Sequence, residues 1–544
     1  MSDGSGDLDT LLIGIDAACE PVFDRLYETD SIPNLKALIE RGTSAPLTSQ
    51  IPPWTPSAWP SMYTGVNPGK HGVYGFVAFD GYDWEVVTSN HVREHALWTL
   101  LDRHDLTSVV VNVPVTHPPD EIDGAIVPGF IGPESPRSHP EGILEEIREA
   151  IGEYRVYPNY SRGDEHYTDD EKMEEYCTLA RMRGEAFRYL TGRFEPDFGF
   201  VEFQKTDTVF HEFEGDVEKV RQIYEATDEQ IGRILEECDP DRVFVASDHG
   251  IGPYENYEFR VNEFLREEGY VETITGGKGM PSWNPIRNQL RAGEDETRWE
   301  PGTVERLAAK AASIGITPSQ VGALLRRVGL ESVVKQYVPS GVTRTGSKQV
   351  DFAGSRAYMR ARTELGVRIN LEGRDPEGKV PEEQYEDVRD ELIERLSRVE
   401  TPDGDPVFGE VVPREEYFHG PYVDEAVDVI AVPNEFEQFL SAQLVGTQFG
   451  PPTEPWNHKL DGLFVAAGEG IDVDADLSGA HLFDVAPTIM AALGVPHSDR
   501  MDGSALPVVE EGESTEYPTY SDEDATTAGD ETVEKRLADL GYLE

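Results

Sequence analysis

Short apolar runs alternate with amphipathic helical patterns along most of this chain, and this alternation constrains the fold more than any other feature of the sequence. The first run begins at Thr10, continues through Leu-Leu-Ile-Gly-Ile and stops at the carboxylate of Asp16. Such runs are typical of strands that are buried on both faces of a parallel sheet. We therefore predict a doubly wound α/β fold with a mostly parallel sheet. Further strand patterns cover residues 108–113, 197–203, 242–247, 427–432 and 462–467, and helical patterns cover residues 31–41, 142–151, 169–190 and 217–237.

Local end signals support the first predicted helix, at residues 31–41. Ser31 is expected to be its N-cap, Pro33 lies in its first turn and Gly42 follows its last residue. These residue types are favoured at these positions because they satisfy or tolerate the backbone geometry of a helix end.

The alternation is interrupted at residues 273–349, where a Gly/Pro-rich stretch precedes two short amphipathic patterns. We interpret this region as a helical cap inserted over the sheet. The α/β core would then comprise residues 7–272 and 350–508. Residues 509–544 form an acidic tail that is poor in apolar residues, and a short helix is expected at its end, at 531–544.

The excess of acidic over basic residues limits the partners that the chain can bind and indicates the solution in which it works. The chain has 104 Asp and Glu against 47 Lys and Arg, a formal net charge of −57, and this excludes binding to long nucleic acids through their phosphates. Hydrophobic residues make up 38% of the chain, so it can form a core and is not a disordered acidic segment. Only 12 of the basic residues are lysines. An acidic, lysine-poor surface is typical of proteins that work in concentrated salt, where charge repulsion is screened.

The cysteines and the first residues suggest a compartment. Cys19, Cys177 and Cys238 are widely spaced and form no Cys-x-x-Cys pair, which favours a reducing cytosol. The segment from Met1 to Thr10 is polar and acidic, unlike a secretory signal. No run of 18 apolar residues occurs, so we expect no membrane span and a cytoplasmic location. The oligomeric state stays open.

Polar side chains that can bind metals recur at the ends of the predicted strands. In open α/β sheets the ligand crevice lies outside the carboxyl ends of the strands. Asp207 and His211 are four residues apart, so they would face the same way on a helical turn, as two ligands of one metal often do. The candidate ligands are Asp16, Asp207, His211, Asp248, His249 and His458.

Each of these residues alone is explained more simply as a helix cap, a turn residue or a surface residue. Three carboxylates and three imidazoles at equivalent positions are harder to explain in that way. This set of nitrogen and oxygen donors suits Zn²⁺, with Mn²⁺ or Fe²⁺ as alternatives, and is too rich in nitrogen for Mg²⁺ or Ca²⁺ alone.

Thr55 is the candidate nucleophile. Pro56 suits the first turn of a helix, which would make Thr55 its N-cap. A cap role is the simpler interpretation. However, the positive end of a helix dipole also favours a phosphate, and a nearby dication can lower the pKa of an alcohol enough for it to act as a nucleophile.

Taken in order, these motifs resemble the alkaline phosphatase superfamily, and most closely its type I phosphodiesterase/nucleotide pyrophosphatase-like group of phosphohydrolases and phosphomutases. The resemblance extends from Asp16 to about Pro507 and implies the corresponding α/β fold. The segments that carry it are Asp16, Thr55 with Thr64-Gly65, Pro68-x-x-His71-Gly72, Asp207-x-x-x-His211, Ser247-Asp-His-Gly250, His458, Asp484–Ile489, Leu493–Pro496, Met501–Gly503 and Arg536–Tyr542.

The resemblance implies two metal sites and a covalent phospho-threonine. One divalent ion would be held by Asp207, His211 and His458. The other would be held by the remaining candidate ligands and the hydroxyl of Thr55, which lies ten residues before Gly65 as in phosphodiesterase members.

Two departures from the group concern the substrate. Nucleotide pyrophosphatases carry an asparagine shortly after the His-Gly pair, where this chain has Phe76, and Lys205 or Asn90 are candidates to replace it. His419 is a further candidate for the pocket. The Cys-x-Pro-x-Arg segment of sulfatases is absent, which argues against sulfatase activity.

The function predicted from the sequence is metal-dependent hydrolysis of a small phosphate ester, by a phosphodiesterase or phosphatase mechanism. A phosphomutase, which would return the phosphoryl group to a second hydroxyl, is the alternative. A metal-stabilised binding protein without turnover is the second alternative, and the presence of a candidate nucleophile argues against it.

Overall fold

The computed structural model describes residues 8–27, 29–160, 166–275 and 348–521. Most of the expected cap, including its two amphipathic patterns at 303–313 and 318–328, therefore lies outside the described residues, as does the helix expected at 531–544. The ends of the cap region pair with each other as two short antiparallel strands, β11 (Thr273–Thr275) and β12 (Lys348–Val350).

A seven-stranded sheet forms the centre of the molecule, in the order β2-β20-β8-β1-β7-β5-β6. Strand β20 is antiparallel to both of its neighbours, and the other pairs in the sheet are parallel. The predicted doubly wound, mostly parallel sheet is therefore confirmed. The strands are β1 (Leu8–Ile15), β2 (Thr43–Thr48), β5 (Ser108–Val111), β6 (Gly124–Val127), β7 (Phe198–Phe203), β8 (Pro240–Ala246) and β20 (Asp461–Gly468).

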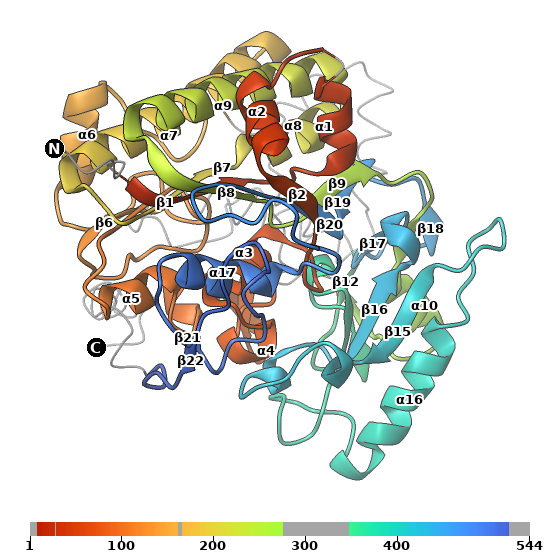
Figure 1. Ribbon diagram of the computed structural model, residues 1–544. Helices are drawn as coiled ribbons and strands as arrows, with labels where there is room; N and C mark the ends of the chain where they lie inside the picture. The colour runs from red at the N-terminus through yellow and green to blue at the C-terminus, as the bar shows by residue number, and fades with distance from the viewer. Residues whose placement is uncertain (1–7, 28, 161–165, 276–347, 522–544) are drawn as a thin grey trace, which may run out of the picture.

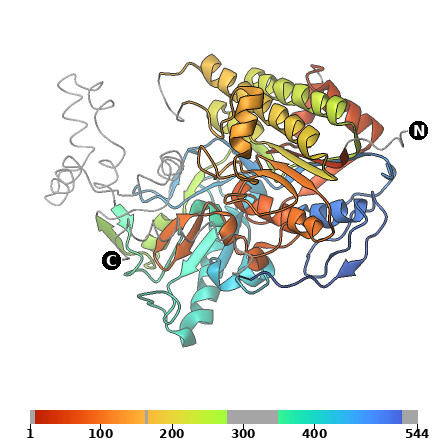
Figure 2. The ribbon, with the colours of Figure 1, turned by 90° about the vertical axis from the view of Figure 1, so that its left-hand side faces the viewer.

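Helices cover both faces of this sheet and bury its alternating side chains in two separate cores. Figure 2 shows the layers from the side, with the yellow-green α7 and α9 on one face and the blue α17 on the other. One layer contains α1 (Glu20–Tyr27), α2 (Pro33–Arg41), α6 (Ile143–Ile151), α7 (Asp169–Phe194) and α9 (Val217–Cys238). The other contains α3 (Thr55–Thr64), α5 (Leu97–Asp102) and α17 (Val485–Ala492).

The predicted N-cap of α2 is wrong. The N-cap residue is Ile32, whose side chain makes no capping hydrogen bond, and Pro33 begins the helix. The hydroxyl of Ser31 instead lies 2.8 Å from that of Thr29. The fixed φ of proline, rather than a side-chain cap, marks this helix start.

A second, four-stranded antiparallel sheet has the order β13-β14-β16-β15 and its own hydrophobic core, with one long helix packed against it. The strand predicted at 427–432 exists but belongs here, so its expected place in the central sheet is wrong. An apolar run does not say which sheet it joins. The elements are β13 (Ala357–Tyr358), β14 (Gly366–Ile369), β15 (Phe408–Pro413), β16 (Val429–Pro433) and α16 (Tyr385–Leu396).

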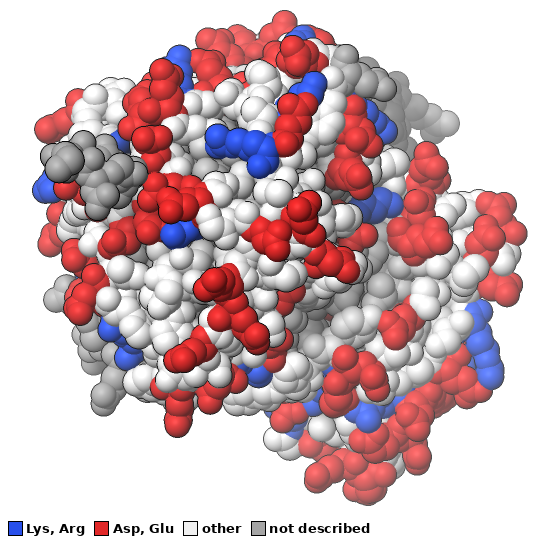
Figure 3. Space-filling view, viewed as in Figure 1, with Lys and Arg blue, Asp and Glu red and all other residues white. Residues whose placement is uncertain are grey.

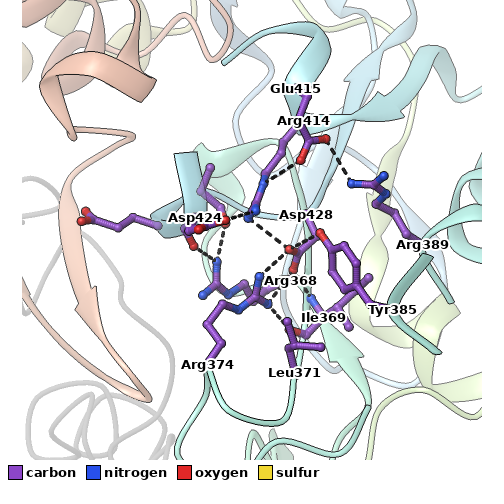
Figure 4. A network of polar contacts seen from close by, with 12 residues as sticks. Arg368, Ile369, Leu371, Arg374, Tyr385, Arg389, Arg414, Glu415, Asp424 and Asp428 are labelled. Carbon is purple, nitrogen blue, oxygen red and sulfur yellow. Dashed lines mark hydrogen bonds and ion pairs between the residues drawn. The ribbon is translucent and has the colours of Figure 1, made fainter. Parts of the chain in front are cut away.

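Asp428, directly before β16, joins these elements through a buried polar network (Figure 4). Its carboxylate accepts hydrogen bonds from Arg374 at 2.6 and 2.9 Å and from Arg414 at 3.2 Å. The Tyr385 hydroxyl and the backbone N–H of Ile369 donate to it at 2.9 and 2.7 Å. Burial alone would raise the pKa of Asp428, but the hydrogen bonds and charges of the arginines lower it to about 2.

Smaller elements complete the described fold. They are α4 (Pro68–His71), α8 (Lys205–Phe213), α10 (Val261–Glu267), β3 (Val77–Asp80), β4 (Asp83–Val86), β9 (Gly250–Pro253), β10 (Glu258–Arg260), β17 (Phe439–Ser441), β18 (Phe449–Gly450), β19 (Trp456–Lys459), β21 (His497–Ser498) and β22 (Ser514–Thr515). Among the described helices, none is long and apolar enough to cross a membrane. Acidic side chains are spread over the face drawn in Figure 3 and outnumber basic ones there.

Candidate active site

The topology of the central sheet brings the six candidate ligands to one edge. Strand β1 lies between β7 and β8, with Ile15 paired to Phe203 and Gly14 paired to Ala246. The segments that follow these three strands therefore start side by side. Because β20 runs antiparallel, the segment before it, which contains His458 on β19, reaches the same edge, and β19 pairs with β9 directly after His249.

Asp207, His211 and His458 form the first half of the site. Asp207 and His211 lie on α8, one helical turn apart as predicted, and Nε2 of His211 is 3.1 Å from Oδ1 of Asp207. Nε2 of His458 is 3.6 Å from the same oxygen and 3.2 Å from Nε2 of His211. Three donor atoms thus converge on one small volume.

The second half of the site is centred on Nε2 of His249. This atom lies 3.4 Å from Oδ1 of Asp16, 3.2 Å from Oδ2 of Asp248 and 3.3 Å from Oγ1 of Thr55. The imidazoles of His249 and His458 are stacked, with ring centroids 3.6 Å apart, so the two halves are adjacent. Asp248 and His249, which are neighbours in the chain, both reach the site as expected for residues in a loop.

Backbone carbonyl oxygens fix the tautomers of two imidazoles. Nδ1 of His249 lies 2.9 Å from the carbonyl oxygen of Gly250, and Nδ1 of His458 lies 2.8 Å from that of Pro53. A carbonyl oxygen only accepts, so each Nδ1 carries a hydrogen, and Nε2 of each ring is directed into the site. This is the orientation in which a histidine binds a metal.

The carboxylates of the site are buried and in part without hydrogen-bond partners. Asp16 and Asp248 are fully buried, and the unpartnered oxygens among the described residues include both of Asp16, Oδ1 of Asp207 and Oδ2 of Asp248. Burial, followed by the charges of Asp248 and Asp207, raises the pKa of Asp16 well above its usual value, and burial raises the pKa of Asp248 to about 6. Unpartnered carboxylate oxygens and imidazole lone pairs that face one another fit divalent cations. Two groups of three such residues have ligand atoms close enough to hold one ion: Asp16, Asp248 and His249 of the second half, and Asp207, His249 and His458, which spans both halves.

Glu454 is a site residue that the sequence patterns missed. Its Oε2 lies 3.8 Å from Nδ1 of His211, on the side of the ring away from the other ligands. Asn457 donates to the same oxygen at 3.0 Å, and Arg362 donates to both oxygens at 3.0 and 3.1 Å. At this distance the contact with His211 is a charge contact and not a hydrogen bond, so the negative charge of Glu454 acts on the ring from the side opposite the site. The signal in the sequence that could have identified Glu454 is its position four residues before His458.

Thr55 is the first residue of α3, a helix whose residues are all buried. The predicted N-cap position is wrong by one residue, because Trp54 is the N-cap and no side-chain capping bond is present. The Thr55 hydroxyl is therefore not engaged in capping, and it faces Nε2 of His249. The helix ends at Gly65, whose φ of +70° is the left-handed conformation common at helix C-termini.

A closed circuit of buried hydrogen bonds supports α3 from behind and explains the His-Gly motif. The backbone N–H of Val73 donates to Nδ1 of His71 at 3.1 Å, so Nε2 carries the hydrogen and donates to Oγ of Ser61 at 2.8 Å. Ser61 donates in turn to the side-chain oxygen of Gln50. The Gln50 amide donates to Ser57, which donates to the carbonyl oxygen of Val73 at 3.0 Å. Burial lowers the pKa of His71 to about 3, which is consistent with a neutral ring.

The three candidate substrate residues do not converge with the six ligands in the same way. Lys205 is buried at the start of α8, where burial, then the charge of Arg183, lowers its pKa to about 8. Asn90 lies half-buried in a short 3₁₀ turn. His419 is exposed and lies 2.8 Å from Asp502, in a separate surface network. Phe76 packs edge-on against the ring of Phe130.

Comparisons with known proteins identify a family and similar folds. Residues 10–327 match the model of a family described as type I phosphodiesterase / nucleotide pyrophosphatase. No curated protein matches the chain. Phosphonoacetate hydrolase from Sinorhizobium meliloti 1021, in complex with phosphonoformate, has a similar structure, with a TM-score of 0.50 at 15% identity over 88% of this chain and 94% of that chain. A variant of the alkaline phosphatase PafA is similar with a TM-score of 0.50 at 14% identity, over 91% of this chain and 97% of that chain. At these identities the likeness shows a shared fold.

Proposed function

The chain belongs to the type I phosphodiesterase / nucleotide pyrophosphatase family and is a phosphoester hydrolase, and from this premise we propose that it acts through a covalent phospho-threonine formed on Thr55. The observation that carries the proposal is the position of the Thr55 hydroxyl, 3.3 Å from Nε2 of His249. That nitrogen in turn contacts the carboxylates of Asp16 and Asp248. A nucleophile thus lies within reach of a cluster of metal-ligand type.

Two divalent cations would occupy the two halves of the site. Asp207, His211 and His458 would hold one of them. The other would be held by Asp16, Asp248, His249 and the Thr55 hydroxyl. The nitrogen-rich donor set favours zinc, with manganese or iron as alternatives. When bound, such ions lower the pKa of the Thr55 hydroxyl and neutralise negative charge on the phosphoryl group during its transfer.

The reaction would proceed through two displacements at phosphorus, with Thr55 as the nucleophile of the first and the leaving group of the second. Its Oγ attacks in line and forms an Oγ–P bond while the bond from phosphorus to the leaving oxygen breaks, and the leaving oxygen takes up a proton. Water then attacks the phospho-threonine, the Oγ–P bond breaks and the hydroxyl of Thr55 regains its proton. Two inversions give net retention at phosphorus. The buried helix α3 holds Oγ in place, and its N-terminal dipole favours the anionic phosphoryl group.

We propose a small phosphate ester as substrate, handled in concentrated salt inside the cell. The net charge of −57 would repel phosphate esters at low ionic strength, and salt reduces this repulsion beyond a Debye length of about 3 Å at 1 M. Lys205 is the candidate substrate residue closest in the chain to the ligands. Asn90 and His419 stay candidates for contacts with more distant parts of the substrate.

The test is turnover of bis-p-nitrophenyl phosphate and p-nitrophenyl phosphate at high salt with added Zn²⁺ or Mn²⁺. Release of p-nitrophenol with multiple turnovers is expected for a hydrolase. With p-nitrophenyl phosphate, transfer of the phosphoryl group to an added alcohol without release of free phosphate would favour a phosphomutase. Two bound metal ions without turnover of any phosphoester would favour a binding protein.

A further inference from the structure

Four buried hydroxyl groups are joined to the main chain of the candidate ligands. Ser49 follows β2, Thr206 lies in the first turn of α8, Ser247 follows β8 and Tyr254 follows β9. These residues are at most 5% exposed. None of them is a candidate ligand, and the two proposed displacements at phosphorus make no use of them.

Each hydroxyl donates a hydrogen bond of 2.5–2.7 Å to the backbone carbonyl oxygen of a different candidate ligand. The four pairs are Thr206 with Asp16, Ser49 with Asp248, Ser247 with His249 and Tyr254 with His458. The four acceptors are the candidate ligands that lie outside α8. The other two, Asp207 and His211, lie on that helix, whose geometry sets their main chain. The main chain of each of the six ligands is therefore held either by a helix or by a buried hydroxyl.

Three of these four hydrogen bonds join distant parts of the chain. Those from Thr206, Ser49 and Tyr254 span 190, 199 and 204 positions. The bond from Ser247 spans two positions, as in a local turn. A buried hydroxyl usually has a backbone acceptor, so a single contact of this kind needs no special explanation. Contacts from separate segments to each of the four non-helical ligands indicate that the hydroxyls fix the ligands in place.

His458 shows how completely a ligand is held. Its backbone N–H donates to the side-chain oxygen of Asn457 at 2.8 Å, and its carbonyl oxygen accepts the hydroxyl of Tyr254. Its Nδ1 lies 2.8 Å from the carbonyl oxygen of Pro53. These contacts engage every polar atom of His458 except Nε2, which is directed into the site. The ring is therefore in place before a cation arrives.

Thr206 joins the two halves of the site. It directly precedes Asp207 of the first half on α8, and its hydroxyl holds the carbonyl oxygen of Asp16 in the second half. The same hydroxyl lies 2.8 Å from the carbonyl oxygen of Phe203, which also accepts the backbone N–H of Asp16 at 3.3 Å. The segments that carry Asp16 and Asp207 are therefore fixed to each other.

We propose that Ser49, Thr206, Ser247 and Tyr254 are positioning residues that hold the ligands in their metal-binding arrangement before the cations bind. The proposal rests on the proposed function, because it takes the two cation sites as given. A ligand whose main chain is already fixed loses little conformational entropy when a cation binds to it. The four hydroxyls thus increase the affinity for the cations without contacting them.

The affinities of single variants for Zn²⁺, measured by competition with a chelator, test the proposal. Tyr254→Phe should weaken the ion held with His458 about tenfold and leave the other ion unchanged, and Ser49→Ala should do the reverse. Thr206→Val should weaken both ions, and Thr206→Ser, which keeps the hydroxyl, should show the wild-type affinities. Repeating the measurements in His458→Ala and in Asp248→Ala, each of which should retain one ion, distinguishes the two sites.

Thr191→Val and Tyr157→Phe are the matched controls. Each removes a buried hydroxyl that donates to a carbonyl oxygen outside the ligand set, Thr191 to Phe187 at 2.9 Å and Tyr157 to Gly132 at 2.7 Å. The controls should lower the Tm of the metal-free protein by an amount similar to that in the test variants but leave both affinities unchanged. The visible absorption of the Co²⁺-loaded protein, which reports coordination geometry, should change in Tyr254→Phe and Thr206→Val and not in the controls.

The possible results separate this proposal from the proposed function. Wild-type affinities in Tyr254→Phe, Ser49→Ala and Thr206→Val would overturn the positioning role and leave the proposed function intact. Equal losses of affinity in test and control variants would show a general loss of packing and would also overturn it. If the wild type itself binds no cation, the proposed function fails and this proposal fails with it.

Discussion

The Nε2 atoms of His211 and His458 lie 3.2 Å apart and face each other across the carboxylate of Asp207. The ring of His458 carries its hydrogen on Nδ1, which lies 2.8 Å from the carbonyl oxygen of Pro53. Its Nε2 lone pair is therefore directed at the second imidazole. This arrangement is the one that two ligands of a common cation adopt, and it holds together residues that are 247 positions apart in the chain.

Metal content is the first prediction. The protein purified with Zn²⁺ or Mn²⁺ should contain two ions per chain, and His458→Ala and Asp248→Ala should each contain about one, because each substitution removes a ligand from one half of the site. Elemental analysis after gel filtration measures this. Asp461→Ala, near the site edge but outside both ligand groups, should keep two ions. Metal-free wild type would contradict the proposed ligand sets.

Glu454→Gln tests the residue behind His211. The amide keeps the size of the side chain but loses the negative charge that lies 3.8 Å behind the ring of His211. We expect about 10- to 100-fold weaker binding of one metal ion, with a parallel loss of activity at limiting metal. Titration against a competing chelator measures the affinity. Glu437→Gln, which affects a carboxylate paired with Lys459 instead, should leave the affinity unchanged. Equal affinities of both variants would contradict the assigned role.

His71→Ala tests the circuit behind α3. The substitution leaves a cavity and takes away the partners of Ser61 and of the Val73 N–H, so the free energy of unfolding should fall by about 2–4 kcal/mol. The kcat should fall more than KM changes, because the helix that carries the nucleophile loses its support. His71→Gln, which retains an N–H donor, should recover part of kcat. His91→Ala, at the surface, should cost less than about 1 kcal/mol. An unchanged kcat in a folded His71→Ala protein would show that the circuit is purely structural.

Asp428 gives a prediction of pH dependence. Its pKa of about 2 in the folded state lies below the usual 3.8, so its contribution to stability is fully present above about pH 4 and is lost as the pH falls through about 2. The difference of nearly two pKa units corresponds to about 2 kcal/mol. The stability gap between the wild type and Asp428→Asn should therefore narrow by this amount from pH 5 to pH 2. Denaturant unfolding at constant salt measures the gap, and a gap independent of pH would contradict the network in Figure 4.

The sequence was sufficient to predict five of the seven strands of the central sheet, all but β2 and β6, and the meeting of the six candidate ligands. Apolar runs that stop at Asp16 or precede Asp248 mark strand ends, and parallel strands bring their ends to one edge. His458 precedes a strand instead of following one. It reaches the same edge only because β20 runs antiparallel to its neighbours in the sheet. The apolar run that predicts β20 does not show in which direction the strand runs.

Other features depend on contacts that no local pattern records. Glu454 is one of 104 acidic residues, and only its distance from His211 distinguishes it. The run at 427–432 joins the second sheet because of its pairing with β14 and β15. The caps predicted at Ser31 and Thr55 failed because proline at the helix start made a side-chain cap unnecessary.

Covalent chemistry on Thr55 is the central claim, and acid quenching of the enzyme during turnover of bis-p-nitrophenyl phosphate tests it most directly. Mass spectrometry of the quenched wild type should find a p-nitrophenyl phosphoryl group on Thr55, because the first displacement expels only one of the two p-nitrophenol groups. Thr55→Ala should show none, and its kcat should be at least about 10³-fold lower. Full turnover by Thr55→Ala, with both metal ions bound, would contradict the mechanism.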